Sequence, residues 1–174
     1  PMEIRIAGTV DDSIVDGPGC RYTIFTQGCP HHCQGCHNPQ SHDFAAGRVV
    51  DTEDILTQVR RNPLLDGITL SGGEPFCQPE ACKVLADAAH QLGLNVWCYT
   101  GYTWEKLHQE ADPARMALLD AVDVLVDGPF ILAQKSLELQ YCGSKNQRLI
   151  DVRKSKEQGT LHLWTRSLAD WDVL

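Results

Sequence analysis

The sequence has no apolar run near the roughly 18 residues that a membrane-spanning helix needs. It also has no apolar signal segment at its N-terminus, no internal repeat and no low-complexity tract. Basic residues are few, because 15 Lys and Arg stand against 23 Asp and Glu, for a net charge of −8. A nucleic-acid-binding surface depends mainly on Lys and Arg that neutralise phosphates. These absences predict a cytoplasmic protein that binds neither a membrane nor nucleic acid directly.

The length and composition predict one compact domain. The chain has 174 residues, of which 43% are hydrophobic and 22% charged, close to the average for a soluble globular protein. A chain of this size buries a substantial core. We therefore expect a single domain over 1–174, with 153–174 as a C-terminal tail.

Cysteine is the residue type that needs an explanation. The eight cysteines are Cys20, Cys29, Cys33, Cys36, Cys77, Cys82, Cys98 and Cys142. A secreted disulfide scaffold would spread its cysteines at framework spacings through a shorter chain. Here three of them lie within eight residues and the others have apolar neighbours. This pattern favours a reducing compartment and a metal cofactor bound by thiolates.

Short β-branched runs alternate with helical patterns along the chain. Strands are predicted over 21–26, 67–71, 94–99, 122–126 and 147–152, with a possible edge piece over 161–164. Helices are predicted from Asp51 to Asn62, from Gln78 to Gly93, from Thr103 to Leu107 and over 114–119. This alternation predicts an α/β fold with a mostly parallel sheet and right-handed crossovers.

The unusual loops follow the predicted strands. The cysteine cluster follows the first strand, and Gly72–Pro75, Thr100–Tyr102 and Asp127–Phe130 follow the next three. Because the carboxyl ends of parallel strands share one edge, we expect these loops on a single rim. Sheets and barrels of the α/β class place their active sites at that rim.

The cysteine cluster has the spacing C-x3-C-x2-C, formed by Cys29, Cys33 and Cys36. Three close thiolates can hold a cubane 4Fe–4S cluster, which normally takes four cysteines, so that one iron stays open for another ligand. The alternative is a structural zinc site whose fourth ligand is His31, His32, His37 or His42. Zinc sites usually pair C-x2-C with a distant second pair, which this sequence lacks.

The cysteine motif, followed after the next strand by Gly72-Gly73-Glu74-Pro75, resembles the radical S-adenosylmethionine superfamily. The resemblance implies that Cys29, Cys33 and Cys36 hold one 4Fe–4S cluster per chain, whose open iron binds S-adenosylmethionine. It also implies that Gly72, Gly73 and Glu74 lie along the methionine moiety. Glycines allow close backbone approach and a carboxylate suits an ammonium group, in agreement with these roles.

Further motifs are similar to those of enzymes that activate glycyl-radical enzymes. They are Asp16–Arg21, Cys36–Asn38, Trp97–Tyr102 and Val124–Phe130. The stretch Gly143–Val152 is similar to the signature of the branch that acts on anaerobic ribonucleotide reductases. The resemblance implies an incomplete, partial TIM-type βα barrel, a large glycyl-radical enzyme subunit as the partner, and a small electron-donor protein.

Two positions depart from these patterns. Gly35 stands where many superfamily members carry an aromatic residue that flanks adenine, so the resemblance implies an adenine contact from the Gly35–Cys36 backbone, with His37 close by. Cys142 stands where arginine is expected.

Several other polar residues are assigned ordinary structural roles. Cys20 and Cys98 are expected to act as small apolar residues, and His31 and His32 to face solvent. Asp127 is expected to form a turn, although its place on the rim also allows a ligand role.

We therefore predict an oxidoreductase that cleaves S-adenosylmethionine reductively and generates a glycyl radical on a partner enzyme. One alternative is the activating enzyme of another glycyl-radical enzyme, such as pyruvate formate-lyase, or a small-molecule radical S-adenosylmethionine enzyme. An alternative without catalysis is a zinc-stabilised interaction module.

Overall fold

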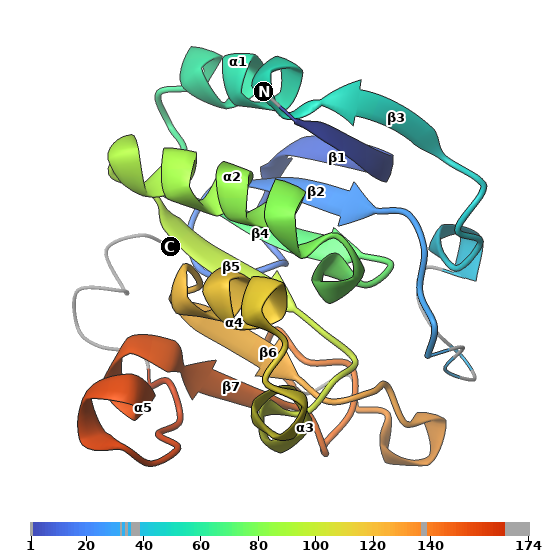
Figure 1. The fold of residues 1–174 in the computed structure, drawn as a ribbon, viewed down its shortest axis with the longest axis vertical. Helices are drawn as coiled ribbons and strands as arrows, with labels where there is room; N and C mark the ends of the chain where they lie inside the picture. Colours follow the sequence, from blue (N-terminus) through green and yellow to red (C-terminus); the bar gives the residue numbers. More distant parts are fainter. Residues whose placement is uncertain (1, 32, 34, 36–38, 137–138, 166–174) are drawn as a thin grey trace.

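The computed structural model describes residues 2–31, 33, 35, 39–136 and 139–165. A seven-stranded sheet forms the centre, with the strand order β3-β1-β2-β4-β5-β6-β7 (Figure 1). The strands are β1 (Glu3–Ser13), β2 (Arg21–Thr26), β3 (Arg48–Asp51), β4 (Gly67–Gly72), β5 (Asn95–Tyr99), β6 (Val124–Asp127) and β7 (Arg148–Asp151). The sheet is open and is not closed into a barrel. Together with the helices described next, it gives a mixed α/β fold.

Five α-helices accompany the sheet in the described ranges. They are α1 (Thr52–Arg61), α2 (Pro79–Gln91), α3 (Trp104–Glu110), α4 (Pro113–Asp120) and α5 (Val152–Gln158). Short 3-10 turns are η1 (Pro39–Ser41), η2 (Pro75–Cys77) and η3 (Leu132–Gln134). Among these residues no helix has the length and apolar character to cross a membrane.

The prediction of a mostly parallel sheet is right only for the centre. β2, β4, β5 and β6 pair in parallel, whereas β1 pairs antiparallel with β2 and with β3, and β7 pairs antiparallel with β6. A parallel neighbour needs a crossover, usually a helix. The chain between β6 and β7 contains only the short turn η3 among its described residues, and it returns antiparallel.

The predicted helix starts are confirmed by their capping contacts. Asp51 precedes α1 and its side chain accepts a hydrogen bond from the backbone N–H of Glu53 at 2.8 Å. Thr103 caps α3 in the same way, and Pro79 occupies the first turn of α2. Gly93 follows α2 with a φ of +78°, a conformation that glycine adopts readily.

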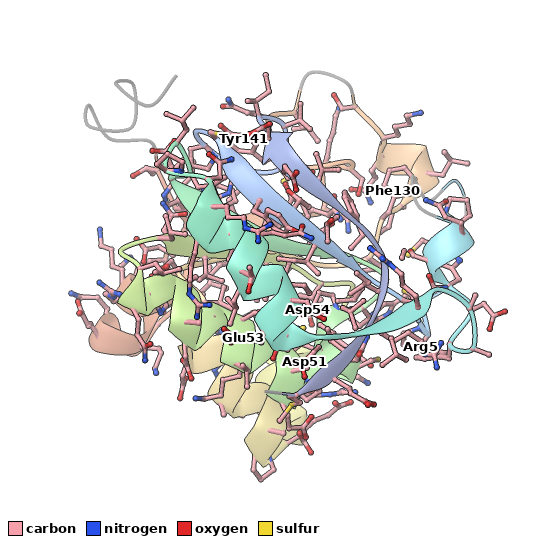
Figure 2. All side chains as sticks on the ribbon, turned by 90° about the horizontal axis from the view of Figure 1, so that it is seen from above. Arg5, Asp51, Glu53, Asp54, Phe130 and Tyr141 are labelled. Carbon is pink, nitrogen blue, oxygen red and sulfur yellow. The ribbon has the colours of Figure 1, made fainter. Side chains whose placement is uncertain are left out.

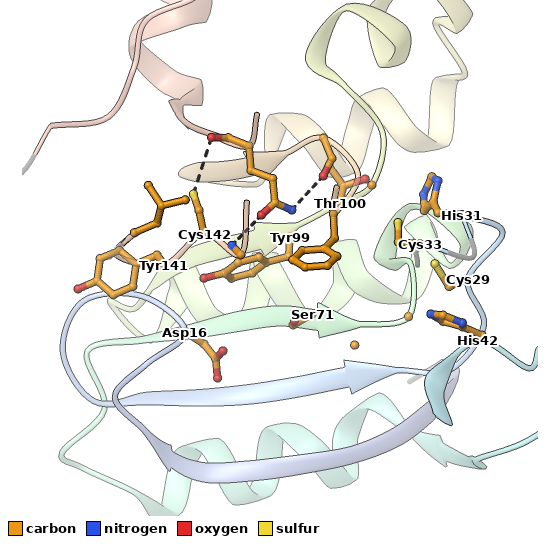
Figure 3. Close-up of a pocket in the computed structure, with 18 of the residues that line it drawn as sticks. Asp16, Cys29, His31, Cys33, His42, Ser71, Tyr99, Thr100, Tyr141 and Cys142 are labelled. Atoms are coloured by element: carbon orange, nitrogen blue, oxygen red, sulfur yellow. Dashed lines mark hydrogen bonds between the residues drawn. The ribbon is translucent and has the colours of Figure 1, made fainter. Parts of the chain in front are cut away.

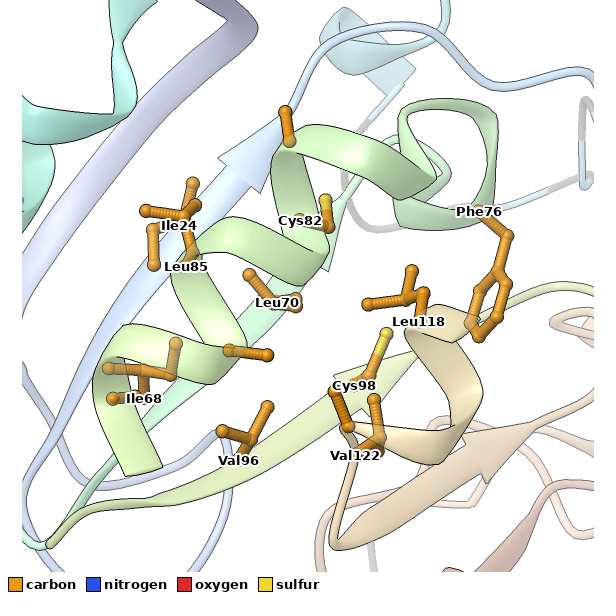
Figure 4. Packing of buried hydrophobic residues seen from close by; sticks show 14 of the residues in the cluster. Ile24, Ile68, Leu70, Phe76, Cys82, Leu85, Val96, Cys98, Leu118 and Val122 are labelled. Atoms are coloured by element: carbon orange, nitrogen blue, oxygen red, sulfur yellow. The ribbon is translucent and has the colours of Figure 1, made fainter. Parts of the chain in front are cut away.

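The main core lies between one face of the sheet and α1, α2 and α4 (Figures 1 and 4). Ile24, Ile68, Leu70 and Val96 come from the strands, and Leu85 projects from α2 to meet them. Cys82 and Cys98 are fully buried in this core, as apolar residues would be. Burial raises the pKa of both thiols.

The other face of the sheet carries a smaller cluster around Trp97, Val124 and Val126. Tyr141 and Trp164 pack edge-to-face on Trp97, with ring centroids 5.2 and 5.0 Å away. None of the described residues in this cluster belongs to a helix, and Tyr99, Tyr141 and Cys142 of the cluster also line the cavity described below.

Candidate active site

A cavity of about 380 Å³ opens at the carboxyl ends of the parallel strands (Figure 3). Its walls come from the loops after β2, β4, β5 and β6, from the connection between β1 and β2, and from the segment that precedes β7. The prediction that the four motif-bearing loops share one rim is therefore confirmed. The cysteines lie at one end of the cavity, and Asp16, Tyr141 and Cys142 lie toward the other (Figure 3).

Cys29 and Cys33 both line the cavity. The base of their loop is fixed by the backbone, since Gly28 donates to the carbonyl of Ser41 at 2.6 Å and Cys29 to that of His42 at 3.1 Å. Cys36, the third predicted ligand, lies outside the described residues, as does His37. The described residues contain no group of three possible metal ligands.

The donors that are described fit an iron–sulfur cluster. Two soft sulfur ligands, four positions apart on one loop, face a cavity with room for a cofactor. Thiolates of this kind are the usual ligands of such clusters. Cys29 is 8% exposed, so it lies against the protein wall.

Gly72 and Gly73 place the loop after β4 directly against the cysteine loop. A Cβ atom on Gly73 would lie 2.4 Å from the carbonyl oxygen of Gly28. Gly72 has a φ of +93°, and a Cβ there would lie 2.6 Å from the Cα of Phe25. A side chain at Gly73 would therefore push the two loops apart, and one at Gly72 would collide with the backbone of β2. Both glycines line the cavity, as expected for residues that approach a ligand closely.

Glu74 is fully buried, and its carboxylate is bound by the protein. It accepts hydrogen bonds from the hydroxyl of Thr100 at 2.9 Å, the N–H of Gly101 at 2.8 Å and the N–H of Phe76 at 3.0 Å. His31 Nε2 lies 2.6 Å from the same carboxylate. Among the described residues Glu74 is not part of the cavity wall. Its contact with the methionine moiety stays a prediction.

The expectation that His31 faces solvent is wrong. His31 lines the cavity and its side chain is only 16% exposed. Spacing alone could not show this, because the partner of His31 is 43 residues away.

Gly35 packs against the loop that follows β6. It has a φ of +73°, and a Cβ there would lie 2.8 Å from Leu132 Cδ1 and 3.4 Å from Phe130 Cε2. Phe130 itself lines the cavity. An adenine contact at Gly35 remains a prediction.

The far end of the cavity is built on a buried arginine. Arg21 has no exposed surface, and it donates to Thr69 Oγ1 at 2.8 Å and to the carbonyl of Pro18 at 2.9 Å. Thr69 in turn donates to the backbone carbonyl of Asp16 at 2.7 Å. Arg21 and Thr69 therefore hold the loop that presents Asp16 to the cavity. Burial lowers the pKa of Arg21 to about 10.

Asp127 has a structural partner that sequence reasoning missed. It is 1% exposed, and Arg148 of β7 donates to its two oxygens at 3.0 and 2.5 Å. The N–H of Trp104 donates to it at 2.8 Å. These contacts hold the turn before Phe130. In addition, Gln147 donates to the carbonyl of Gly128 at 3.1 Å.

Cys142, at the position where arginine is expected, lines the cavity away from Cys29 and Cys33 (Figure 3). Burial, with a smaller contribution from Asp127, raises the pKa of its thiol to about 11. At neutral pH this side chain is a neutral thiol, so it cannot supply the charge of an arginine.

The fold and its cysteine loop define a protein of the iron–sulfur class, since residues 15–150 match the family described as "4Fe-4S single cluster domain". Within that class, the chain belongs to the family of anaerobic ribonucleoside-triphosphate reductase-activating proteins. It is 36% identical to the member from Haemophilus influenzae over 145 residues, which cover 77% of this chain and 89% of the relative.

The family reaches beyond bacteria. The member from Enterobacteria phage T4 is 31% identical over 144 residues, covering 78% of this chain and 86% of the relative. Among solved structures, QueE from Escherichia coli matches with a TM-score of 0.45 and 18% identity, over 58% of this chain and 53% of that one. The family assignment favours the iron–sulfur interpretation of the cysteine loop over the zinc-stabilised module.

Proposed function

We propose that this chain is a radical S-adenosylmethionine enzyme that generates a glycyl radical on an anaerobic ribonucleoside-triphosphate reductase. The observation that carries the proposal is the meeting of the cysteine loop and the Gly72-Gly73 loop at one cavity, in a member of this family. The partner is a large glycyl-radical enzyme subunit, and a small protein donates the electron. The predicted cytoplasmic location fits this role.

Cys29, Cys33 and Cys36 would hold the 4Fe–4S cluster. S-adenosylmethionine would lie along Gly72, Gly73 and Glu74, with its adenine near Gly35, Cys36 and His37. When bound, the reduced cluster supplies the electron that cleaves S-adenosylmethionine into methionine and a 5′-deoxyadenosyl radical. The chain's own residues bind the cofactor, orient it toward the target glycine, and limit access of water and oxygen.

We also propose that the open sheet is an arc of an incomplete βα barrel. Its support is the set of four parallel strands, β2, β4, β5 and β6, with α1, α2 and α4 on one face. The cavity at the carboxyl ends of these strands is where barrels of this type place their sites.

Metal content and cofactor cleavage test the proposal. Protein purified without oxygen should be brown and carry about four irons per chain. Cys33→Ala should lose both the cluster and the cleavage of S-adenosylmethionine. Cys20→Ala is the matched control, because Cys20 is half-buried away from the cavity and should retain both. A colourless protein with stoichiometric zinc would refute the proposal.

The partner is tested separately by electron paramagnetic resonance. Reduced protein, S-adenosylmethionine and an anaerobic ribonucleotide reductase should together give the doublet of a glycyl radical. A doublet with a formate-lyase-type partner, and none with the reductase, would show that the substrate protein is a glycyl-radical enzyme of that other class.

A further inference from the structure

His31 connects the cysteine loop to the loop after β4. Its Nε2 atom lies 2.6 Å from Glu74 Oε1, and Glu74 is fully buried. Glu74 already accepts hydrogen bonds from Thr100, Gly101 and Phe76, so its carboxylate acts as an acceptor here as well. His31 Nε2 is therefore the donor in this contact.

The imidazole of His31 also fits into a space left by the loop after β5. A Cβ atom on Gly101 would lie 2.3 Å from His31 Cδ2, and the three atoms nearest to it all belong to the His31 ring. On the next residue, the Tyr102 ring meets His31 edge-on, with centroids 4.6 Å apart and an interplanar angle of 77°. Arg115 lies over the same tyrosine ring, 4.7 Å from its centroid.

Three motifs that are separate in the sequence thus meet at one side chain. The cysteine loop contributes His31, the Gly-Gly-Glu turn contributes Glu74, and the Thr-Gly-Tyr loop contributes Gly101 and Tyr102. We call Glu74, Gly101 and Tyr102 the His31 socket. A buried carboxylate that is satisfied by donors from three loops holds those loops at fixed distances.

We propose that His31 is a positioning residue, whose insertion in the socket fixes the part of the loop that carries Cys29 and Cys33. The proposal rests on the proposed function, because it assumes that these sulfurs hold a cluster. His31 then contributes to the site through Glu74 and the loop geometry and is not itself a ligand. In this arrangement Glu74 also has a second role, as the hydrogen-bond acceptor that holds His31, in addition to the predicted cofactor contact.

The first test compares His31→Gln with His31→Asn. The amide nitrogen of glutamine can take the place of Nε2 and donate to Glu74, whereas that of asparagine takes the place of Nδ1 and falls short. Both proteins are loaded with cluster. We then measure the rate of iron release to a ferrous chelator and the electron paramagnetic resonance spectrum of the reduced cluster. His31→Gln should stay within about twofold of wild type, and His31→Asn should release iron about tenfold faster with a changed spectrum.

The second test uses the steric contact. Gly101→Ala places a methyl group where the His31 ring lies, so it should displace the ring and accelerate iron release about as much as His31→Asn does. In a His31→Ala background the ring is gone, and Gly101→Ala should add no further effect. His90→Ala, on a surface ion pair with Asp123, is the control, and circular dichroism verifies that each variant is folded.

Equal behaviour of His31→Gln and His31→Asn, or full additivity of Gly101→Ala with His31→Ala, would overturn the proposal. If wild type holds a four-iron cluster and cleaves S-adenosylmethionine while these results occur, the proposed function stands and only the role of His31 is wrong. If wild type holds no cluster, the proposed function fails and the inference fails with it.

Discussion

Arg148 binds Asp127 through two guanidinium nitrogens and Glu105 through one of them, at 2.6 Å. The two carboxylates differ in environment, because the Asp127 side chain is 1% exposed and that of Glu105 is 53% exposed. Removing the cation leaves the buried charge of Asp127 without an ion-pair partner and, among the described residues, with only the Trp104 N–H as a donor, whereas removing the Glu105 charge leaves every buried group satisfied. The same arginine therefore takes part in one important and one minor ion pair.

Arg148→Met should consequently lower the free energy of unfolding by about 3 kcal/mol. The matched variant Glu105→Gln should cost less than about 1 kcal/mol, as expected for an exposed ion pair. Urea denaturation followed by circular dichroism measures both values. Similar small losses for the two variants would show that Asp127 does not depend on Arg148.

Cys142 should react slowly with iodoacetamide at pH 8. Burial raises its pKa to about 11 from an ordinary value of 9.0, so the reactive thiolate should be about 10- to 100-fold scarcer than in the unfolded chain. Because the folded pKa is the higher one, the neutral thiol favours folding fully below pH 9, and this contribution is lost as the pH rises toward 11. Mass spectrometry of the alkylated peptide, with urea-unfolded protein as the control, measures the rates. Equal rates in both states would contradict the pKa shift.

At this scale the sequence predicts residues whose chemistry depends on spacing. Cys29 and Cys33 were found because their separation is itself the signal. His31, Arg21 and Arg148 were missed because each acts on a residue at least 21 positions away, or on backbone carbonyls that no residue type reveals. The Thr100-Gly101-Tyr102 motif indicates a loop on the same rim, but its residue types do not indicate a contact with the cysteine loop.

Helix capping illustrates how elements follow from local sequence. Figure 2 shows Asp51, Glu53 and Asp54 together at the start of α1. Asp51 accepts from a backbone N–H that would otherwise have no partner, and it also ends β3 opposite Glu3. The helix buries Ile55, Leu56 and Val59 against the sheet, so its start fixes part of the core.

Asp51→Ala should lower the free energy of unfolding by about 1 kcal/mol, because it removes this cap. Asp54→Ala is the matched control, since Asp54 is an exposed acid in the same first turn, where its charge contributes only about 0.3–0.5 kcal/mol. Thermal and urea denaturation provide the comparison. A larger loss for Asp54→Ala would contradict the capping role.

The two strands that the sequence missed, β1 and β3, lie next to each other on one side of the sheet. β1 was overlooked because its apolar residues Ile4 and Ile6 precede a stretch with Gly8, Asp11 and Asp12, which reads as a loop. β3 has only four residues. The direction of β7 depends on the length and course of the preceding connection, which hydrophobic patterning does not report.

For the molecule as a whole, cofactor binding should raise the free energy of unfolding and the melting temperature. A ligand present at one hundred times its dissociation constant adds about 2.7 kcal/mol to the folded state. In a domain of this size that corresponds to a rise of roughly 5–10 °C in melting temperature. S-adenosylmethionine should produce this shift in the iron-loaded protein, measured without oxygen, and should produce none in Cys33→Ala. A shift of equal size in that variant would show that binding does not need the cluster.

The family and the position of the site were predictable at this scale, because a few motifs fall at equivalent places on successive strands. The cavity's shape was not. It depends on Arg21 and Gln147, which hold two of the surrounding loops through contacts with Pro18 and Gly128. Such contacts exist only once the strands are in order.

The His31 socket has a consequence for the timing of assembly. Its parts are supplied by residues 74, 101 and 102, so a nascent chain that ends just after β4 contains His31 and Glu74 but lacks Gly101 and Tyr102. The cysteine loop of such a chain has only part of the His31 socket available. If the socket anchors the cysteine loop as proposed, stable iron binding should require a polypeptide that has been synthesised through Tyr102, beyond β5.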